Sequence, residues 1–416
     1  MKKPLSILFV ATADVTFENG YRVRIVSEVR SLLREGVKVQ VLSFLHIREL
    51  IQGFPGSLKL GRMLRETGSS VQYVPVFPDF KTSLLLWLTA KYKQFILSSY
   101  VAMHDVSLIH CHGHGAAFVA VGARPSRSIP IVFDMHGAVP EEVEADDLLP
   151  SVRQKMFERA EKMERYAIEG VDAVISVSQA LQSHWQSKYP SVHPKTLVIP
   201  CAVDSEIFNC DFVSRAQLRK RWGIPDQAPI LVYSGALQPY QCINQIIAVA
   251  SELIVIDPTT KMLFLIPPHH RVELERILDE SNLPQEAYII ESVGHDNVSR
   301  YLSAADVGFL LRTDDIFNKV AFPTKFAEYL SCGLPVIATP YVDAVREAIE
   351  LDHVGIVLKS YREDEVVRLR AFVHSVMMNR DEWRGRCRSA AENKFAWNLF
   401  GSKIKELYMD IAGENI

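Results

Sequence analysis

Residues 312–339 read RTDDIFNKVAFPTKFAEYLSCGLPVIAT, and this stretch decides the fold class. An apolar run at Val307–Leu311 leads into it, and a second apolar run at Pro335–Thr339 closes it. Between them, a polar loop is followed by a helix-length segment that stops at Gly333, since glycine commonly ends a helix. Strand, loop, helix and strand in this order predict a β–α–β unit with parallel strands.

The same alternation of short apolar runs and helix-length segments extends along the whole chain. In the first half we expect strands at Ile7–Ala11, Val37–Phe44, Val71–Val76, Leu108–His110, Ile131–Asp134, Ala173–Ser176 and Thr196–Ile199. In the second half we expect them at Ile230–Tyr233, Met262–Ile266, Tyr288–Ile290, Val307–Leu311, Pro335–Thr339 and Gly355–Leu358. Two such series predict an α/β protein of two facing Rossmann-like domains with parallel sheets, with ligands beyond the carboxyl ends of the strands.

Composition favours a globular protein and argues against nucleic acid as a partner. Hydrophobic residues make up 48% of the 416 residues and charged residues 23%. The net charge is −3, whereas a general nucleic-acid binder needs a basic excess to neutralise phosphates. The six cysteines are scattered without a CxxC pair, so neither a zinc framework nor disulfides are expected and a cytoplasmic location is favoured.

The apolar stretch at Leu84–Ala90 has two open interpretations. It is too short for a membrane span, which needs roughly 18 to 20 apolar residues, and Lys91 follows it at once. It is either part of a buried helix or part of a helix within 81–100 that rests on a membrane surface. In the second case the lysines would lie above and Leu84, Leu85, Leu86, Trp87 and Phe95 below.

The helix expected after Phe322 begins with residues that suit an anion site. Pro323 fits the first turn of a helix, and the Thr324 hydroxyl can bond its free amides. The amides and the dipole of a helix start attract anions, so Lys325 in that turn points either to a phosphate partner or to a solvated surface lysine. Glu328 lies one turn further on the same face, where its carboxylate could take both hydroxyls of a ribose.

This segment resembles the donor-binding signature of the GT-B glycosyltransferases of the retaining family 4, in the branch that reads Pro-x-Lys-x-x-Glu-Tyr-Leu-x-x-Gly-x-Pro-Val-Ile. Six shorter segments resemble other parts of that family in the right order. They are Asn19-Gly20, residues 133–137 (FDMHG), residues 172–178 (DAVISVS), residues 199–204 (IPCAVD), residues 234–237 (SGAL) and the final helix at 397–409.

The resemblance implies a nucleotide-sugar-dependent hexosyltransferase that retains anomeric configuration. Its acceptor would be a saccharide, either free or lipid-linked. It implies an acceptor-side domain at 1–205, a donor domain at 206–390 and a C-terminal helix at 391–416 that crosses back onto the first domain. His136 and Lys325 would be catalytic. The residues that would bind the donor are Asn19, Gly20, Ser234, Gly235, Arg312, Pro323, Thr324 and Glu328.

The expected role is surface polysaccharide or glycoconjugate synthesis in the cytoplasm, either away from the membrane or at its inner face. Three positions depart from the family pattern. Ala236 and, by spacing, Gln241 stand where the family has an arginine and a lysine that hold the diphosphate. Val320 stands eight residues before Glu328, where a carboxylate would contact the donor sugar. Lys325 and Arg312 are the nearest substitutes for the missing cations. The alternative is a catalytically impaired nucleotide-binding protein of the same fold, as a pseudoenzyme or partner subunit.

Two further clusters have competing interpretations. His110, His112 and His114 alternate along a strand, which is compatible with a metal site but more typical of a buried strand end. Glu141 and Glu142 are either an acceptor-activating pair or acidic residues that favour a helix start. The chain has no Asp-x-Asp or HExxH segment, so we expect no catalytic metal and no cofactor besides the nucleotide sugar.

Overall fold

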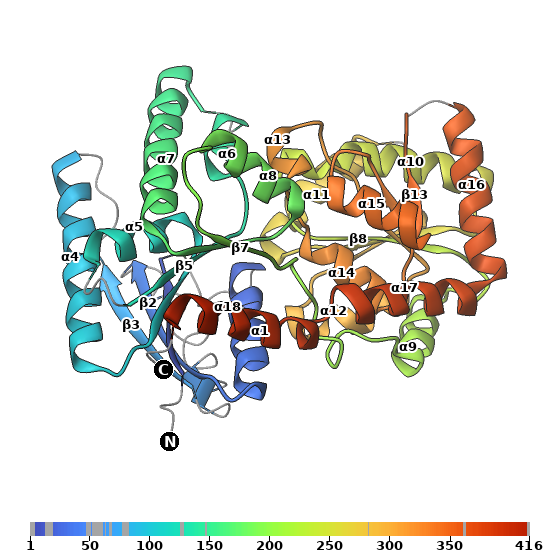
Figure 1. Ribbon diagram of the computed structural model, residues 1–416. Coiled ribbons are helices and arrows are strands. Elements are labelled where there is room, and N and C mark those ends of the chain that lie inside the picture. Colours follow the sequence, from blue (N-terminus) through green and yellow to red (C-terminus); the bar gives the residue numbers. More distant parts are fainter. Residues whose placement is uncertain are drawn as a thin grey trace. The chain divides into compact units, whose positions relative to one another are not determined.

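The computed structural model of the protein describes residues 5–12, 20–46, 51, 61–62, 64–65, 69–76, 83–124, 129–145, 148–281, 283–360 and 363–413 (Figure 1). It describes the backbone but not the side chains of residues 83–84 and 363–364. The chain divides into two compact units. The first comprises Met1–Pro200 and Trp397–Ile416, and the second comprises Cys201–Ala396. The expected limits at 205 and 391 lie within a few residues of these divisions.

The first unit is built on a parallel sheet of seven strands in the order β3-β2-β1-β4-β5-β6-β7. The strands are β1 (Ser6–Ala11), β2 (Lys38–His46), β3 (Ser70–Val76), β4 (Leu108–His112), β5 (Ile131–Met135), β6 (Ala173–Ser176) and β7 (Lys195–Val198). All residues of β1, β4, β5 and β6 are buried, because helices cover both faces of a parallel sheet.

The second unit has a parallel sheet of six strands in the order β10-β9-β8-β11-β12-β13. The strands are β8 (Ile230–Ser234), β9 (Lys261–Leu265), β10 (Tyr288–Glu291), β11 (Val307–Leu310), β12 (Val336–Ala338) and β13 (Gly355–Val357). In both units the strand order reverses beside the first strand, and ligands of such sheets bind at that switch point. The ends of β8 and β11 therefore mark where a ligand of the second unit belongs.

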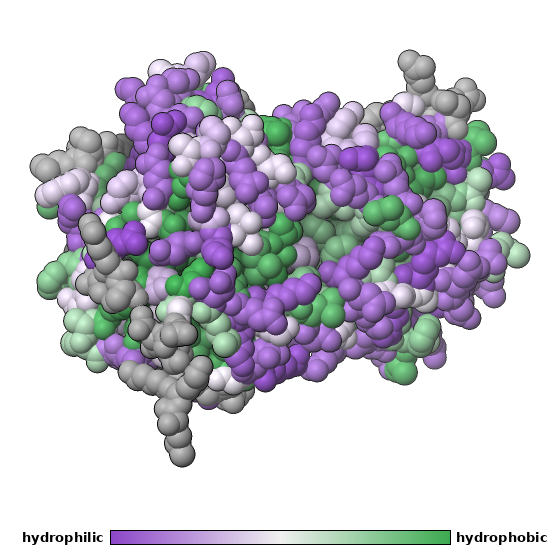
Figure 2. Space-filling model, in the orientation of Figure 1, coloured by the Kyte–Doolittle hydropathy of each residue, from purple (hydrophilic) through white to green (hydrophobic). Residues whose placement is uncertain are grey.

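The predicted α/β class with parallel sheets is confirmed, and each predicted strand is present with its ends within two residues of prediction. Helices connect the strands. Those of the first unit are α1 (Gly20–Arg34), α4 (Ser83–Met103), α5 (Gly113–Ala123), α6 (Val139–Ala145), α7 (Pro150–Gly170), α8 (Gln179–Lys188), η4 (Trp397–Leu399) and α18 (Gly401–Ala412). Figure 2 shows hydrophilic side chains over α7, in keeping with its charged sequence.

The described helices of the second unit include three short 3-10 helices and the one-turn helix α13 besides longer α-helices. They are α9 (Phe212–Trp222), η1 (Pro239–Gln241), α10 (Ile243–Ile256), η2 (Pro268–His270), α11 (Arg271–Asp279), η3 (Gln285–Ala287), α12 (His295–Leu302), α13 (Ile316–Lys319), α14 (Thr324–Ser331), α15 (Asp343–Asp352), α16 (Glu363–Met378) and α17 (Arg380–Lys394). The stretch Pro239–Ile256 is apolar enough to cross a membrane by length and composition. Half of it is buried, and Ile246 and Ala250 belong to the core of the unit, so we interpret it as a core helix.

The C-terminal helix α18 packs on α1 within the first unit. The Ser31 hydroxyl donates a hydrogen bond to the Trp397 carbonyl (2.8 Å), and Lys405 Nζ donates one to the Glu35 carbonyl (2.7 Å). A Cβ on Gly401 would lie 2.8 Å from the Ser31 carbonyl oxygen, so glycine permits this close approach. The segment after Ala396 thus belongs to the first unit, although the whole second unit precedes it in the chain.

Helix α4 is buried on one side and carries an exposed apolar strip on the other. Leu97 and Tyr100 are buried, whereas Trp87 is 55% and Phe95 69% exposed. Lys91 is also exposed and lies over the Trp87 ring, with Nζ 6.0 Å from its centroid. The expectation that the lysines oppose the apolar residues is therefore wrong for Lys91. Lys81 and the Leu84 side chain lie outside the described part of the chain.

Candidate active site

The loop after β8 brings the backbone of the second unit close to Lys325. The Ser234 amide donates a hydrogen bond to the Tyr329 hydroxyl (2.9 Å), and the Gly235 amide donates one to the Leu265 carbonyl (2.9 Å). Gly235 has φ +141°, and a Cβ there would lie 2.7 Å from Lys325 Nζ. Glycine is thus needed both for the backbone conformation and for the space that Lys325 occupies.

The helix α14 begins at the residue that the sequence indicates. Thr324 is its first residue, and Pro323 precedes it as the N-cap. Within the part of the chain that the structure describes, no side chain makes a capping hydrogen bond there, so the expectation that the Thr324 hydroxyl bonds the first amides is wrong. The reason is register: a capping side chain must precede the helix, and that position holds proline. The first amides of α14 consequently lack a side-chain acceptor from the cap.

Two cations, Arg312 and Lys325, lie close to each other beside this helix start. Arg312 follows β11 and is 5% exposed, with its guanidinium 5.7 Å from the Tyr240 ring centroid. Lys325 is partly buried, with Nζ 4.5 Å from the Tyr233 ring centroid. Within the described residues, neither cation forms an ion pair with a carboxylate. Burial, together with repulsion from Arg312, holds the pKa of Lys325 well below its usual range.

The three residues that depart from the family pattern are Gln241, Ala236 and Val320, and the structure shows what each of them contacts or fills. Gln241 is 8% exposed, and its Oε1 accepts a hydrogen bond from Lys325 Nζ (3.0 Å). Ala236 offers only its carbonyl, which accepts a hydrogen bond from the Tyr233 hydroxyl. Val320 is 3% exposed at the end of α13, so an apolar side chain occupies that position. Gln241 therefore orients Lys325 rather than supplying a charge, and Lys325 is not a solvated surface lysine.

Glu328 lies one turn into α14, where it is 7% exposed. Its Oε1 is 3.0 Å from His295 Nε2, and the His295 ring lies 5.2 Å from that of Phe208. His295 was not predicted from the sequence. It is the first residue of α12, shortly after the carboxyl end of β10. Position after a parallel strand was the available signal, but residue type alone does not separate such a histidine from a surface one. Glu328 and His295 therefore place a carboxylate and an imidazole ring side by side near the start of α14.

In the first unit, Asp134 on β5 is the centre of a buried polar network. The Arg24 guanidinium donates two hydrogen bonds to its carboxylate, from Nε to Oδ2 and from an Nη to Oδ1, both at 2.7 Å. Oδ2 is also 3.1 Å from His112 Nδ1 and 2.7 Å from His136 Nε2. Burial alone would raise the pKa of the Asp134 carboxyl, but Arg24 and the histidines hold it well below its usual range.

His136 lies just beyond β5 with its side chain 22% exposed. Its ring packs edge-on to Tyr21 at a centroid distance of 5.3 Å. Burial lowers the pKa of His136, and attraction to Asp134 offsets only part of that effect, so the neutral ring donates one N–H to Asp134 and keeps the other nitrogen as an acceptor. Gly20 opens α1 next to Tyr21, whereas Asn19 lies outside the described residues.

Arg24, Asp134 and Tyr21 were not singled out from the sequence. Arg24 lies on the buried face of α1, and a lone arginine on an amphipathic helix carries no signal of the aspartate that it will meet 110 residues later. Both partners are buried, at 4% and 0% exposure, which makes this a fully desolvated ion pair. The network holds His136 at the carboxyl end of the sheet.

The acidic residues after His136 open a helix. Glu141 and Glu142 are in the first turn of α6. Burial would raise the pKa of the Glu141 carboxyl, but hydrogen bonds from His184 and Lys188 lower it to about 2. So acidic a group is a weak base near neutral pH, which favours the structural interpretation for Glu141. His114 is likewise paired, with Nε2 2.8 Å from Glu164 Oε2.

Comparison with known proteins gives matches along nearly the whole chain. The family described as Glycosyltransferase Family 4 matches residues 19–207, and Glycosyl transferases group 1 matches residues 214–393. The D-inositol 3-phosphate glycosyltransferase of Streptosporangium roseum is 20% identical over 414 aligned residues, which cover 94% of this chain and 88% of that protein.

Solved structures share the fold at low sequence identity. The sucrose-phosphate synthase of Thermosynechococcus elongatus matches with a TM-score of 0.72 at 17% identity, covering 97% of this chain and 98% of that one. Anabaena HepE in complex with UDP matches with a TM-score of 0.70 at 16% identity, covering 97% and 99%. The same protein in complex with UDP-glucose matches with a TM-score of 0.69, also at 16% identity and with the same coverage.

Proposed function

The chain belongs to the GT-B glycosyltransferases of the family 4 and group 1 type, and we propose that it moves a hexosyl group from a nucleotide sugar to a saccharide hydroxyl with retention of configuration. The observation that carries the proposal is the pair of cations at the start of α14. Arg312 and Lys325 lie close together, partly or fully buried. No described carboxylate lies within ion-pair distance of either, and the attraction of Lys325 to Glu328 does not offset the effects of burial and of Arg312. A buried cation without a counter-ion is costly, and a diphosphate removes that cost.

The donor would be held by three parts of the second unit. The first amides of α14 and Lys325 would contact the diphosphate, since helix starts favour anions. The buried Arg312 would add positive charge near the phosphates, and the Gly235 loop would allow them to approach the backbone. Glu328 would accept hydrogen bonds from the ribose hydroxyls, with His295 fixing its carboxylate. HepE, which has the same fold, was solved with UDP and with UDP-glucose.

The reaction breaks the bond between the anomeric carbon and the diphosphate oxygen, and forms one between that carbon and the acceptor oxygen. The acceptor oxygen attacks from the face that the diphosphate leaves, which retains configuration, and its proton passes to the leaving phosphate oxygen. Catalysis then depends on neutralising the leaving diphosphate, which is the work of Lys325 and Arg312. His136, neutral and fixed by Asp134, would orient a sugar hydroxyl through its free ring nitrogen.

A thermal-shift titration tests the donor site first. We expect one of UDP, GDP, ADP, TDP or CMP to raise the melting temperature, because a ligand that binds only the native state stabilises it by mass action. In Glu328→Ala the dissociation constant of that nucleotide should rise about 10- to 100-fold, the size of hydrogen bonds to a charged group. Glu350→Ala, which removes an exposed carboxylate on α15, serves as the matched control.

Turnover separates the proposal from its main alternative, an impaired nucleotide-binding protein, which Ala236, Gln241 and Val320 favour. The transferase should release free nucleoside diphosphate from its sugar conjugate only when an acceptor is present. Nucleotide binding without release under any acceptor would support the impaired protein. No thermal shift in a folded sample with any of the nucleotides would contradict both.

Nucleotide binding should take up protons. The pKa of free Lys325 lies below its usual range, so the neutral amine becomes more populated as pH rises through that pKa. A diphosphate favours the ammonium form and raises the pKa in the complex. Affinity should therefore be highest below the free-state pKa and decline as pH rises towards the pKa of the complex.

Calorimetry in buffers of different ionisation enthalpy measures this uptake directly. The observed binding enthalpy should depend on the buffer for the wild type and lose most of that dependence in Lys325→Met. A buffer-independent enthalpy in the wild type would show that Lys325 is already fully charged before the nucleotide binds.

We further propose that α4 contacts a membrane that carries a lipid-linked acceptor. The support is the exposed strip of Trp87, Leu88, Lys91, Tyr92 and Phe95. Aromatic and basic side chains on one strip suit the interface of an anionic bilayer. In a flotation assay with anionic liposomes, a large part of the wild type should float, and Trp87→Ser/Phe95→Ser should stay in the soluble fraction. Equal flotation of both proteins would contradict the proposal.

A further inference from the structure

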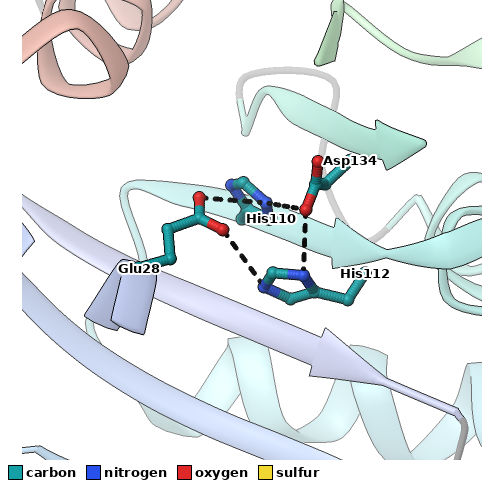
Figure 3. Close-up of side chains that lie close together, drawn as sticks. All are labelled: Glu28, His110, His112 and Asp134. Atoms are coloured by element: carbon teal, nitrogen blue, oxygen red, sulfur yellow. Dashed lines mark ion pairs between the residues drawn. The ribbon is translucent and has the colours of Figure 1, made fainter. Parts of the chain in front are cut away.

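Four buried side chains from three elements of the first unit converge on one point (Figure 3). Glu28 comes from α1, His110 and His112 from β4, and Asp134 from β5. None is more than 1% exposed, and one ligand-type atom of each lies within 4.8 Å of those of the others. The two histidines share one face of the sheet because alternate strand residues point the same way.

In each histidine, Nδ1 faces away from Glu28 and contacts another polar group. His110 Nδ1 is 2.6 Å from the Tyr408 hydroxyl, and His112 Nδ1 is 3.1 Å from Asp134 Oδ2. Both Nε2 atoms and both Glu28 carboxylate oxygens are buried, and none of the described residues is a hydrogen-bond partner of these four atoms. Buried polar groups are almost always satisfied, so four unsatisfied atoms that face one another need an explanation.

The separations between these atoms fit a metal ion. His110 Nε2 is 3.5 Å from Glu28 Oε1, and His112 Nε2 is 3.9 Å from Glu28 Oε2. Both are too long for good hydrogen bonds. Ligands at about 2.0–2.2 Å from a tetrahedral zinc ion lie roughly 3.3–3.6 Å from one another. A small inward movement of His112 would complete that geometry.

The surrounding groups also match those of a zinc site. A histidine that binds zinc through one nitrogen usually donates the other N–H to a carboxylate, a carbonyl or a water. Asp134 is so placed behind His112, and the Tyr408 hydroxyl can accept from His110. Arg24 already occupies both Asp134 oxygens, so Asp134 is better suited to orient His112 than to bind the ion.

We propose that Glu28, His110 and His112 bind a zinc ion through four donor atoms, namely both Glu28 carboxylate oxygens and the two Nε2 atoms. The ion would neutralise the buried carboxylate and join α1 to β4 beneath the His136 network. Its role is structural, because all three ligand side chains are enclosed within the first unit and leave no open face for a substrate. The sequence favoured a buried strand end without a metal ion over a metal site for these histidines, and the proposal departs from that expectation. It does not depend on the proposed transfer reaction.

Elemental analysis of the full chain, purified through a tag without histidine from zinc-supplemented culture, tests the proposal. After dialysis the wild type should hold about one zinc per chain, as a closed site does. Glu28→Gln and His110→Gln should each retain at least about tenfold less, since each loses a ligand. The matched control is His114→Gln: His114 is buried on the same segment but paired with Glu164, so its loss should leave the zinc content unchanged.

Cobalt replacement gives a second readout that does not require a folded variant. The wild type, stripped of zinc and loaded with Co²⁺, should show the intense visible absorption of a tetrahedral site, and zinc should abolish it. A folded wild type with less than about a tenth of an equivalent of any metal and no cobalt spectrum would overturn the proposal. So would Glu28→Gln and His110→Gln proteins that keep the wild-type zinc content.

Discussion

Replacing Lys325 with methionine should lower kcat about 100- to 1,000-fold while raising the donor KM much less. The leaving diphosphate gains negative charge as its bond to the anomeric carbon breaks, so a cation at that oxygen acts mainly in the transition state. Methionine keeps an unbranched side chain of similar length against the Tyr233 ring, which isolates the loss of charge. Steady-state kinetics with the nucleotide sugar found by thermal shift measure the effect.

Lys319→Met is the matched control for this prediction. Lys319 is exposed on α13 and pairs with Asp314, so its removal should leave kcat and KM within about twofold of the wild type. Small and equal losses in the Lys325 and Lys319 variants would contradict the assignment of Lys325. A large rise in KM with unchanged kcat would place Lys325 in ground-state binding instead.

Replacing Arg24 with methionine should destabilise the first unit by about 3–5 kcal/mol, the cost of breaking a buried ion pair on one side. The Asp134 carboxylate would lose both Arg24 hydrogen bonds while remaining completely buried. Arg24 also donates hydrogen bonds to the carbonyls of Ile199 and Pro200, which follow β7. Its loss would leave these two carbonyls without that donor. Urea unfolding followed by tryptophan fluorescence measures the change.

The double variant Arg24→Met/Asp134→Asn gives the matching test. It removes the uncompensated charge along with the arginine, so it should be more stable than Arg24→Met alone although it carries one more substitution. A loss below about 1 kcal/mol in Arg24→Met would show that water or a histidine proton already balances Asp134, and that the pair is not the centre of the network.

Local sequence was sufficient for the elements of this protein. Runs such as Ile131–Asp134 and Ile230–Tyr233 are short, apolar and separated by helix-length segments, and each is a strand of a parallel sheet. The start of α14 was also predicted, because Pro323 and Gly333 mark helix ends through backbone geometry that neighbouring residues decide. The capping role predicted for Thr324 was wrong because the helix begins at Thr324 itself, and a capping side chain must come from the residue before it.

The candidate site was only partly visible in the sequence. The approach of Lys325 to Arg312 depends on β11 and α14 meeting beside β8, and the sequence predicts only that this strand and this helix are consecutive. That Gln241 would hold Lys325, 84 residues away in sequence, was not visible. His295 beside Glu328 was missed for the same reason, because the two come from different helices.

The sequence by itself determined the strands, the helices and the parallel order of the sheets, because periodicity and helix ends act over a few residues. Only the tertiary structure decided which charges are paired. Arg24 meets Asp134 across 110 residues, and Glu28 meets His110 and His112 from a different element. Pairing and burial determine pKa and metal affinity, and both depend on distances that no local pattern records.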